Sequence, residues 1–294
     1  MAEPRYKIRA VNAPFDVNHS SCSNLSPSKF QWSNEKTQYD VHIDRGLLIQ
    51  PDSTTEKQNR YGWICESKFI VPDVYNFLIH NHKVLFENYY NKIFTCDQSL
   101  IDLNSNFKYC PNGSNYPWIP KSDWKVYSKS KLCSMFCSPK RMTEGHAYRH
   151  QVARLALDTG MDVFGGAHGT SRTVTDVRNP WNTKLDGVKD YMFSVVMENG
   201  VYDSYWTEKI TDCFAAGTIP VYWGTKKITS HFDPDGIIWL EPGKEAETLE
   251  SLSPELYISK AEAVQHNYEA LHLLKLADDT LFEMIQHEIP NPIK

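Results

Sequence analysis

The stretch MENGVYDSYWTEK, residues 197–209, gathers carboxylate, amide, aromatic and lysine side chains within thirteen positions. Glu198 and Asn199 stand at the end of the apolar run YMFSVVM, which predicts a buried strand. In open α/β sheets, ligands bind beyond the carboxyl ends of the strands. The two polar side chains therefore stand where a ligand site is expected.

The second half of this stretch predicts the start of a helix. Thr207, Glu208 and Lys209 fall at or inside its first turn, beside backbone N–H groups that have no partner within the helix. A diphosphate would find these amide donors together with Lys209, and the Glu208 carboxylate suits the two hydroxyls of a ribose. From the residue types alone, plain capping is the more common explanation: Thr207 caps the helix, Glu208 complements its dipole and Lys209 is solvated.

These motifs require a parallel sheet, and the hydrophobic pattern predicts one in each half of the chain because short apolar runs alternate with helical patterns. In the first half we expect strands at 6–11, 61–65 and 92–96 and a helix at 74–89. In the second half we expect strands at 131–137, 162–164, 192–197, 219–223 and 236–240, helices at 146–157 and 206–216, and a helical pattern over 260–289. The predicted class is α/β.

A loop-rich segment separates the two halves. Residues 104–123, NSNFKYCPNGSNYPWIPKSD, are dense in Asn, Pro, Gly and Ser, which favours irregular structure. We therefore predict an N-terminal lobe over 1–128 and a C-terminal lobe over 129–294, with the ligand site in the cleft between them. The last helix is expected to pack back on the N-terminal lobe.

Composition limits the class of protein. The net charge is −5 and no block of five like charges occurs, which argues against a nucleic-acid partner. The start, MAEPRYKIRAVNAPF, lacks the apolar core of a signal peptide, and no window reaches the roughly 18 apolar residues of a membrane span. The cysteine number is seven, which is odd, and the spacing fits no disulfide framework. We expect a soluble cytoplasmic protein.

The run FSVVMENGVYDSYWTEKITDCFAAGTIPVYWG, residues 193–224, resembles the signature of the α-1,3-fucosyltransferases, glycosyltransferase family 10. The matching positions are Phe193, Glu198, Asn199, Tyr205, Thr207, Glu208, Lys209, Pro220 and Gly224. Gly200 replaces a Ser or Thr of the pattern and Trp206 a smaller aliphatic residue, so both are candidates for an altered sugar specificity. The similarity is tight over this run and looser over about half of the chain.

The resemblance implies a GT-B glycosyltransferase, with two Rossmann-like lobes facing across a cleft. The donor most in keeping with the family is GDP-fucose. It would bind the C-terminal lobe through Glu198, Asn199, Tyr205, Thr207, Glu208 and Lys209. Glu208 would meet the ribose and Lys209 the phosphates. The acceptor, an oligosaccharide or glycoprotein, would bind the N-terminal lobe.

Two further segments supply candidate phosphate ligands. CSPKRMTEGHAYRHQVARLAL, residues 137–157, looks like the family's arginine-bearing helix, with Arg149 as the matching residue. A guanidinium can stabilise the charge of a departing nucleoside diphosphate without a metal. FGGAHGTSRT, residues 164–173, offers Gly166 and Arg172 for close approach to phosphate, although a glycine-rich loop is more often only a turn.

The first half contains the candidate base. YGWICES, residues 61–67, ends an apolar strand with Glu66, which looks like the glutamate that deprotonates the acceptor hydroxyl in the family. An inverting displacement requires one such base and charge stabilisation on the leaving side. By position alone, a strand-end glutamate that caps the following segment is an equally common outcome.

Three other patterns resemble metal sites. The sequence DPD at 233–235 is typical of a turn, Cys133 and Cys137 fit buried thiols, and His146 and His150 lack a third ligand at metal spacing. We therefore predict no metal and no cofactor beyond the nucleotide sugar.

Two alternatives stay open. The same fold could transfer xylose or galactose from a UDP donor, since exostosin-like transferases share the Gly-x-Ile-Pro-Val ending. The chain could also be a non-catalytic glycan- or nucleotide-binding module.

Overall fold

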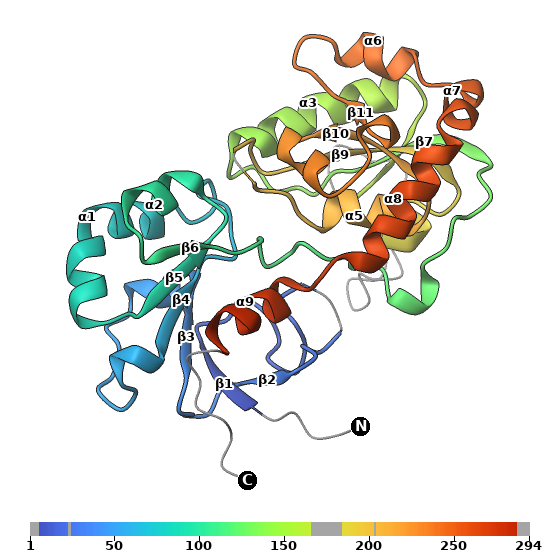
Figure 1. The fold of residues 1–294 in the computed structure, drawn as a ribbon. Helices are drawn as coiled ribbons and strands as arrows, with labels where there is room; N and C mark the ends of the chain where they lie inside the picture. The colour runs from blue at the N-terminus through green and yellow to red at the C-terminus, as the bar shows by residue number, and fades with distance from the viewer. Residues whose placement is uncertain (1–5, 23–24, 166–183, 203, 287–294) are drawn as a thin grey trace. The chain divides into compact units, whose positions relative to one another are not determined.

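The computed structural model describes residues 6–22, 25–165, 184–202 and 204–286, and it divides the chain into two compact units (Figure 1). The first unit comprises Met1–Tyr116, Asp203–Tyr205 and Lys275–Lys294. The second comprises Pro117–Tyr202 and Trp206–Leu274. Each unit contains one parallel sheet with helices, so the predicted α/β class is confirmed.

The first unit is built on a six-stranded sheet in the order β2-β1-β3-β4-β5-β6. Its strands are β1 (Tyr6–Val11), β2 (Phe30–Ser33), β3 (Asp40–Ile43), β4 (Arg60–Trp63), β5 (Lys92–Thr95) and β6 (Phe107–Tyr109). Its helices are η1 (Asp44–Leu48), η2 (Lys57–Asn59), α1 (Pro72–Asn88), α2 (Gln98–Leu103) and α9 (Ala277–Ile285). β2, β3 and β6 are too short to show a period, and β6 lies inside the segment predicted to be loop.

Both faces of this sheet are buried, as a parallel sheet requires. On one face, α9 packs Leu281 and Phe282 against Val41 and Trp63 of the central strands. On the other face, the apolar side chains of α1 pack with Ile93 of β5. The C-terminal helix therefore completes the core of the first unit.

The second unit is built on a five-stranded sheet in the order β11-β10-β9-β7-β8. Its strands are β7 (Lys131–Phe136), β8 (Asp162–Phe164), β9 (Tyr191–Met197), β10 (Ile219–Trp223) and β11 (Ile238–Trp239). Its helices are η3 (Lys121–Asp123), α3 (Glu144–Asp158), α5 (Glu208–Ala215), η4 (Lys226–Ser230), η5 (Pro234–Gly236), α6 (Glu245–Glu250), α7 (Pro254–Ser259) and α8 (Ala261–Leu273).

Three boundaries differ from the sequence prediction for physical reasons. The units divide after Tyr116 rather than at residue 128, because the following segment bonds to α5: Asp212 Oδ1 accepts from the backbone N–H groups of Trp118 (2.8 Å) and Ile119 (3.1 Å). α5 begins at Glu208 rather than at residue 206, because Thr207 is its extended N-cap. The predicted helical pattern at 260–289 is two helices, α8 and α9, which belong to different units.

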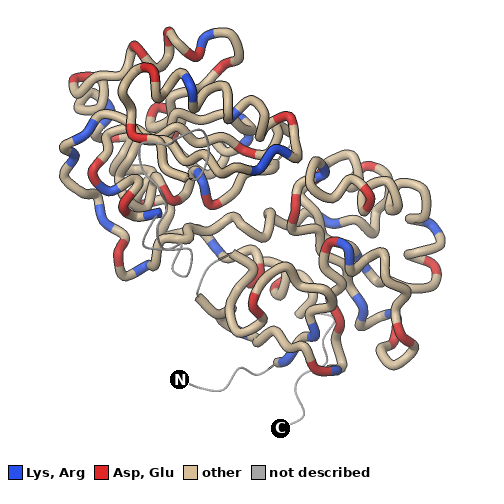
Figure 2. Tube along the Cα trace, turned by 180° about the vertical axis from the view of Figure 1, so that it is seen from behind, with Lys and Arg blue, Asp and Glu red and all other residues tan. Residues whose placement is uncertain are grey.

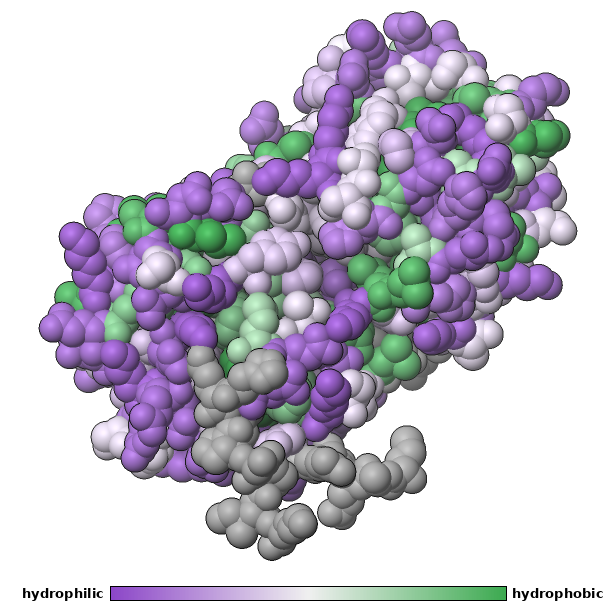
Figure 3. All heavy atoms as spheres, viewed as in Figure 1, coloured by the Kyte–Doolittle hydropathy of each residue, from purple (hydrophilic) through white to green (hydrophobic). Residues whose placement is uncertain are grey.

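The surface carries mixed charge. Figure 2 shows Lys and Arg interspersed with Asp and Glu in both units. On the face drawn in Figure 3, hydrophilic residues predominate and the hydrophobic ones are scattered among them. Among the described residues, no helix has the length and apolar character that crossing a membrane requires. All seven cysteines are buried free thiols.

Candidate functional site

The polar residues of the opening motif meet at the carboxyl end of β9. Glu198 directly follows the strand, and its backbone N–H still donates to Trp223 O of β10 (3.0 Å). The chain then turns and begins α5, whose N-cap Thr207 accepts a hydrogen bond from the N–H of Lys209. A strand end and a helix N-terminus are thus brought together at one sheet edge, as the sequence predicts for a ligand site.

Glu198 organises this edge. Its side chain is fully buried, and its two oxygens accept from Thr207 N (2.9 Å), Thr207 Oγ1 (2.9 Å), Lys209 Nζ (3.2 Å) and Tyr222 OH (3.3 Å). A buried carboxylate is tolerated only with such partners. Glu198 therefore faces protein donors, and it positions Thr207 and Lys209.

Glu208 and Lys209 form a buried ion-pair network. Lys209 Nζ lies 3.6 Å from Glu208 Oε1, and Lys184 Nζ lies 3.8 Å from the same oxygen. Burial opposes the charge of Glu208, but Lys209 and Lys184 outweigh it and hold the pKa of Glu208 below its usual value. Burial likewise opposes the charge of Lys209, but Glu198 and Glu208 raise its pKa. Both side chains are therefore ionised at neutral pH.

Arg149 reaches the same edge from α3. Its Nη2 donates to Met197 O (2.6 Å) and lies 3.3 Å from Glu198 O and 3.5 Å from Asn199 Oδ1. The approach is close because the second residue of the helix is Gly145: a Cβ at this position would lie 2.4 Å from Asn199 O. α3 is thus held against the end of β9, with Arg149 beside Asn199.

His146 joins this cationic region, which the sequence did not indicate. It is buried, and its Nδ1 lies 3.0 Å from Thr143 Oγ1. Burial, followed by the charges of Arg149, Lys140 and Lys209, lowers the pKa of His146 to about 4. The imidazole is therefore neutral at pH 7, and the electrostatic environment at this point favours an anion. The sequence signal that could have found it is its position one helical turn before Arg149.

The pair His146 and His150 has separate partners. His150 Nδ1 lies 3.6 Å from Cys137 Sγ and its Nε2 lies 3.0 Å from Lys140 O. In the described ranges, no three His, Cys, Asp or Glu side chains are grouped as a metal site would need. The DPD sequence is the turn that the sequence predicts, because Asp233 Oδ1 caps the N–H of Asp235 (2.9 Å) in η5.

Glu66 lies at the carboxyl edge of the first sheet. It comes three residues after the end of β4 and is half-buried, and its Oε2 accepts from the N–H of Ser67 (3.3 Å). A second carboxylate that the sequence did not suggest, Asp44, contacts its backbone: Asp44 Oδ1 accepts from Glu66 N (3.1 Å). Its signal in the sequence is weak, since it is a lone aspartate after the short strand β3.

The remaining candidates are placed as follows. Tyr205 is buried, with a relative exposure of 1%, and Trp206 packs edge-on against Phe232. Gly166 and Arg172 lie outside the described residues.

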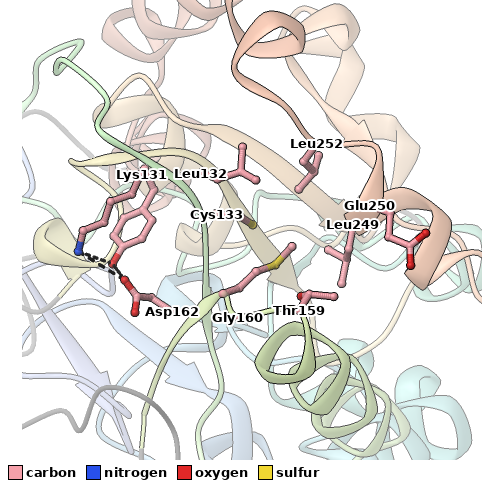
Figure 4. A pocket seen from close by; sticks show the side chains of 11 residues that line it. Lys131, Leu132, Cys133, Thr159, Gly160, Asp162, Leu249, Glu250 and Leu252 are labelled. Atoms are coloured by element: carbon pink, nitrogen blue, oxygen red, sulfur yellow. Dashed lines mark hydrogen bonds and ion pairs between the residues drawn. The ribbon is translucent and has the colours of Figure 1, made fainter.

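The cavity in Figure 4 is not the candidate site. It measures about 550 Å³ and lies at the amino edge of the second sheet, where Lys131, Asp162 and Tyr191 begin β7, β8 and β9. Asp162 Oδ2 accepts from Tyr191 OH (2.5 Å) and pairs with Lys131 Nζ (3.4 Å). Arg149 and Lys209 of the candidate site lie at the opposite, carboxyl edge of the sheet.

The comparisons with solved structures agree with this architecture. The chain is similar to an α1,3-fucosyltransferase solved with GDP-fucose, with a TM-score of 0.56 and 14% identity, covering 100% of this chain and 94% of that one. It is also similar to a variant of the T4 phage β-glucosyltransferase in complex with UDP-glucose, with a TM-score of 0.51 and 10% identity, covering 97% and 99%. The fold is therefore that of the GT-B glycosyltransferases.

The sequence comparisons find a family domain in the second half of the chain. Over 83 residues the chain is 31% identical to the α-(1,3)-fucosyltransferase FucT of Helicobacter pylori, a match that covers 28% of this chain and only 16% of that protein. Residues 126–265 match the model described as glycosyltransferase family 10 (fucosyltransferase) C-term. Residues 126–265 thus match the fucosyltransferase domain of glycosyltransferase family 10, and the resemblance predicted from residues 193–224 is confirmed.

Proposed function

We propose that this protein transfers L-fucose from GDP-fucose to a hydroxyl group of a glycan, with inversion at the sugar carbon. The observation that carries the proposal is the cluster at the carboxyl end of β9, where Arg149 and Lys209 meet the N-terminus of α5. Cationic side chains and a helix N-terminus at one point suit the diphosphate of a nucleotide sugar. The family domain and the solved relatives with GDP and GDP-fucose support the guanine nucleotide.

In the proposed reaction, the second unit stabilises the leaving group. The bond between the fucose C1 and the diphosphate oxygen breaks, and its electron pair leaves with GDP. Arg149 and Lys209 take up the charge that develops on the diphosphate, and Glu198 holds Lys209 in place. Asn199 and Tyr205 would orient the donor, Glu208 would accept from its ribose, and Arg172 and Gly166 are assigned to the phosphates.

The first unit would supply the base. A Glu66 carboxylate oxygen takes the proton of the acceptor hydroxyl while the acceptor oxygen forms the new bond to C1. The donor groups above are all protein side chains and backbone N–H groups, so the proposed mechanism requires no metal.

Thermal-shift titration tests the donor. Ligands that bind the native state increase the free energy of unfolding, by about 2.7 kcal/mol at a ligand concentration of 100 times Kd, and so raise the melting temperature. We expect a shift with GDP and GDP-fucose and a smaller one with UDP and UDP-glucose. A shift with uridine nucleotides alone would refute the fucose donor, and no shift with any nucleotide would support a non-catalytic module.

A release assay tests the base. With a panel of oligosaccharides, Glu66→Gln should lower the GDP release rate by about 100-fold, the range of general-base catalysis, and leave the GDP thermal shift unchanged. Glu87→Gln, at an exposed position of α1, is the matched control and should retain the rate. Normal turnover by Glu66→Gln would exclude this residue as the base.

A further inference from the structure

Asp44 occupies an unusual position beside Glu66. β3 and β4 pair in parallel with Ile43 opposite Trp63, so the residues that follow them, Asp44 and Glu66, come to the same edge of the sheet. Asp44 has a φ of 46° and is only 5% exposed. A left-handed backbone is uncommon for residues other than glycine, and aspartate and asparagine tolerate it best.

The Asp44 carboxylate holds the backbone that carries Glu66. Its Oδ1 accepts from the N–H groups of Cys65 (2.8 Å) and Glu66 (3.1 Å). From the other side, Asn112 Nδ2 donates to Cys65 O. The peptide group before Glu66 is therefore fixed at both its N–H and its carbonyl, by residues that are distant in the sequence.

The second carboxylate oxygen of Asp44 is in a different situation. Oδ2 is buried and has no hydrogen-bond partner among the described residues. Burial raises the pKa of Asp44 to about 7, and the Glu66 charge adds to this rise. The hydrogen bonds from the Glu66 and Cys65 backbone and the Arg45 charge act in the opposite direction and lower the pKa. Arg45 is itself exposed and bound to Asp73 (2.8 Å). The Cys65 thiol is neutral because burial raises its pKa well above the usual value.

We propose that Asp44 is a positioning residue for Glu66, which fixes the backbone of Glu66 through Oδ1. The inference rests on the proposed function only in taking Glu66 as the base. Two neighbouring carboxylates disfavour ionisation of both together. The Glu66 charge contributes to the raised pKa of Asp44, so below about pH 7 Asp44 is the protonated member of the pair.

Two substitutions test the acceptor oxygen of Asp44. Asp44→Asn keeps an oxygen for the N–H groups of Cys65 and Glu66, tolerates the left-handed backbone and removes the charge. Asp44→Gly accepts the backbone but removes the acceptor. The matched control is Asp40→Asn. Asp40 is a buried carboxylate at the start of β3, the strand that Asp44 directly follows, and it pairs with Arg9 (3.1 Å). It is four residues, or about 13 Å along the strand, from Asp44.

The pH profile of kcat/KM is the first measurement. For Asp44→Asn we expect kcat and the ascending limb to stay as in the wild type, because the acceptor oxygen is kept and Asp44 is itself protonated below about pH 7. For Asp44→Gly we expect kcat to fall about tenfold or more, because Glu66 is displaced. Asp40→Asn should lose stability without moving the profile. A kcat of Asp44→Gly equal to that of the wild type would refute the positioning role.

A second measurement does not depend on turnover. Amide exchange at Cys65 and Glu66 should accelerate in Asp44→Gly and stay slow in Asp44→Asn, which keeps the acceptor. If the protein does not release GDP with any acceptor, the proposed function fails while these results still support the inference. Unchanged amide exchange in Asp44→Gly would overturn it.

Discussion

Glu198→Gln is expected to weaken the second unit through a conflict of donors. The amide nitrogen of glutamine must replace one of two oxygens: one accepts from Thr207 N and Tyr222 OH, the other from Thr207 Oγ1 and Lys209 Nζ. Hydroxyls can turn to accept, but the backbone N–H at 2.9 Å and the ammonium at 3.2 Å cannot. In either orientation the glutamine amide nitrogen therefore faces a group that can only donate, either Thr207 N or Lys209 Nζ.

The size of the effect follows from the burial of the pair. Glu198 is fully buried, and breaking a buried ion pair by removing one partner costs about 3–5 kcal/mol. Lys209 keeps a second carboxylate, Glu208 Oε1 at 3.6 Å, so we expect the lower end, about 3 kcal/mol. Lys209→Met should cost about the same, because it leaves the Glu198 charge buried with neutral donors only.

A double-mutant cycle measures the pair itself. Urea denaturation of the wild type, Glu198→Gln, Lys209→Met and the double variant should give a coupling of about 2 kcal/mol, because the double variant buries neither charge. Glu198→Gln combined with Lys227→Met, which changes an exposed lysine of the same unit, is the control and should be additive. Additivity of the Glu198 and Lys209 variants within about 0.5 kcal/mol would show that the network does not hold Lys209.

Three further predictions follow from other sites. Asp278 is fully buried; burial raises its pKa to about 6 against the hydrogen bonds from Trp32 and Ser21. Because the pKa of Asp278 is higher in the folded state than in the unfolded state, Asp278 stabilises the fold below pH 4, and this stabilisation is lost as the pH rises through 6. Denaturation at several pH values should show the difference in unfolding free energy between the wild type and Asp278→Asn falling by up to about 3 kcal/mol over this window. Gly145→Ala places a Cβ 2.4 Å from Asn199 O, so calorimetry should show at least about tenfold weaker GDP binding, and wild-type affinity would contradict the close packing. EDTA should leave GDP release unchanged, and a loss restored by Mg²⁺ would contradict the metal-free mechanism.

The long alternating segments could be predicted from the sequence. The strands at Tyr6–Val11, Asp162–Phe164 and Ile219–Trp223 have the bounds that their apolar runs indicate. β2 and β6 could not be predicted, since strands of four and three residues show no period and exist only by pairing with their neighbours. The helical pattern over 260–289 does not indicate that α8 and α9 belong to different units, because this depends on the surfaces that the two helices pack against.

The residue types at the site follow from local sequence, and their partners do not. Strand ends and helix caps are local features, so Asn199, Thr207 and Lys209 could be assigned to one sheet edge from the motif alone. Whether Glu198 faces a ligand or the protein depends on Tyr222, which belongs to another strand. The pairing of Asp44 with Glu66 likewise joins residues 22 positions apart, through a backbone conformation that no periodicity signals. Local sequence thus sets which groups are available at the site. Their burial, pairing and charge depend on contacts between distant parts of the chain, which no local pattern encodes.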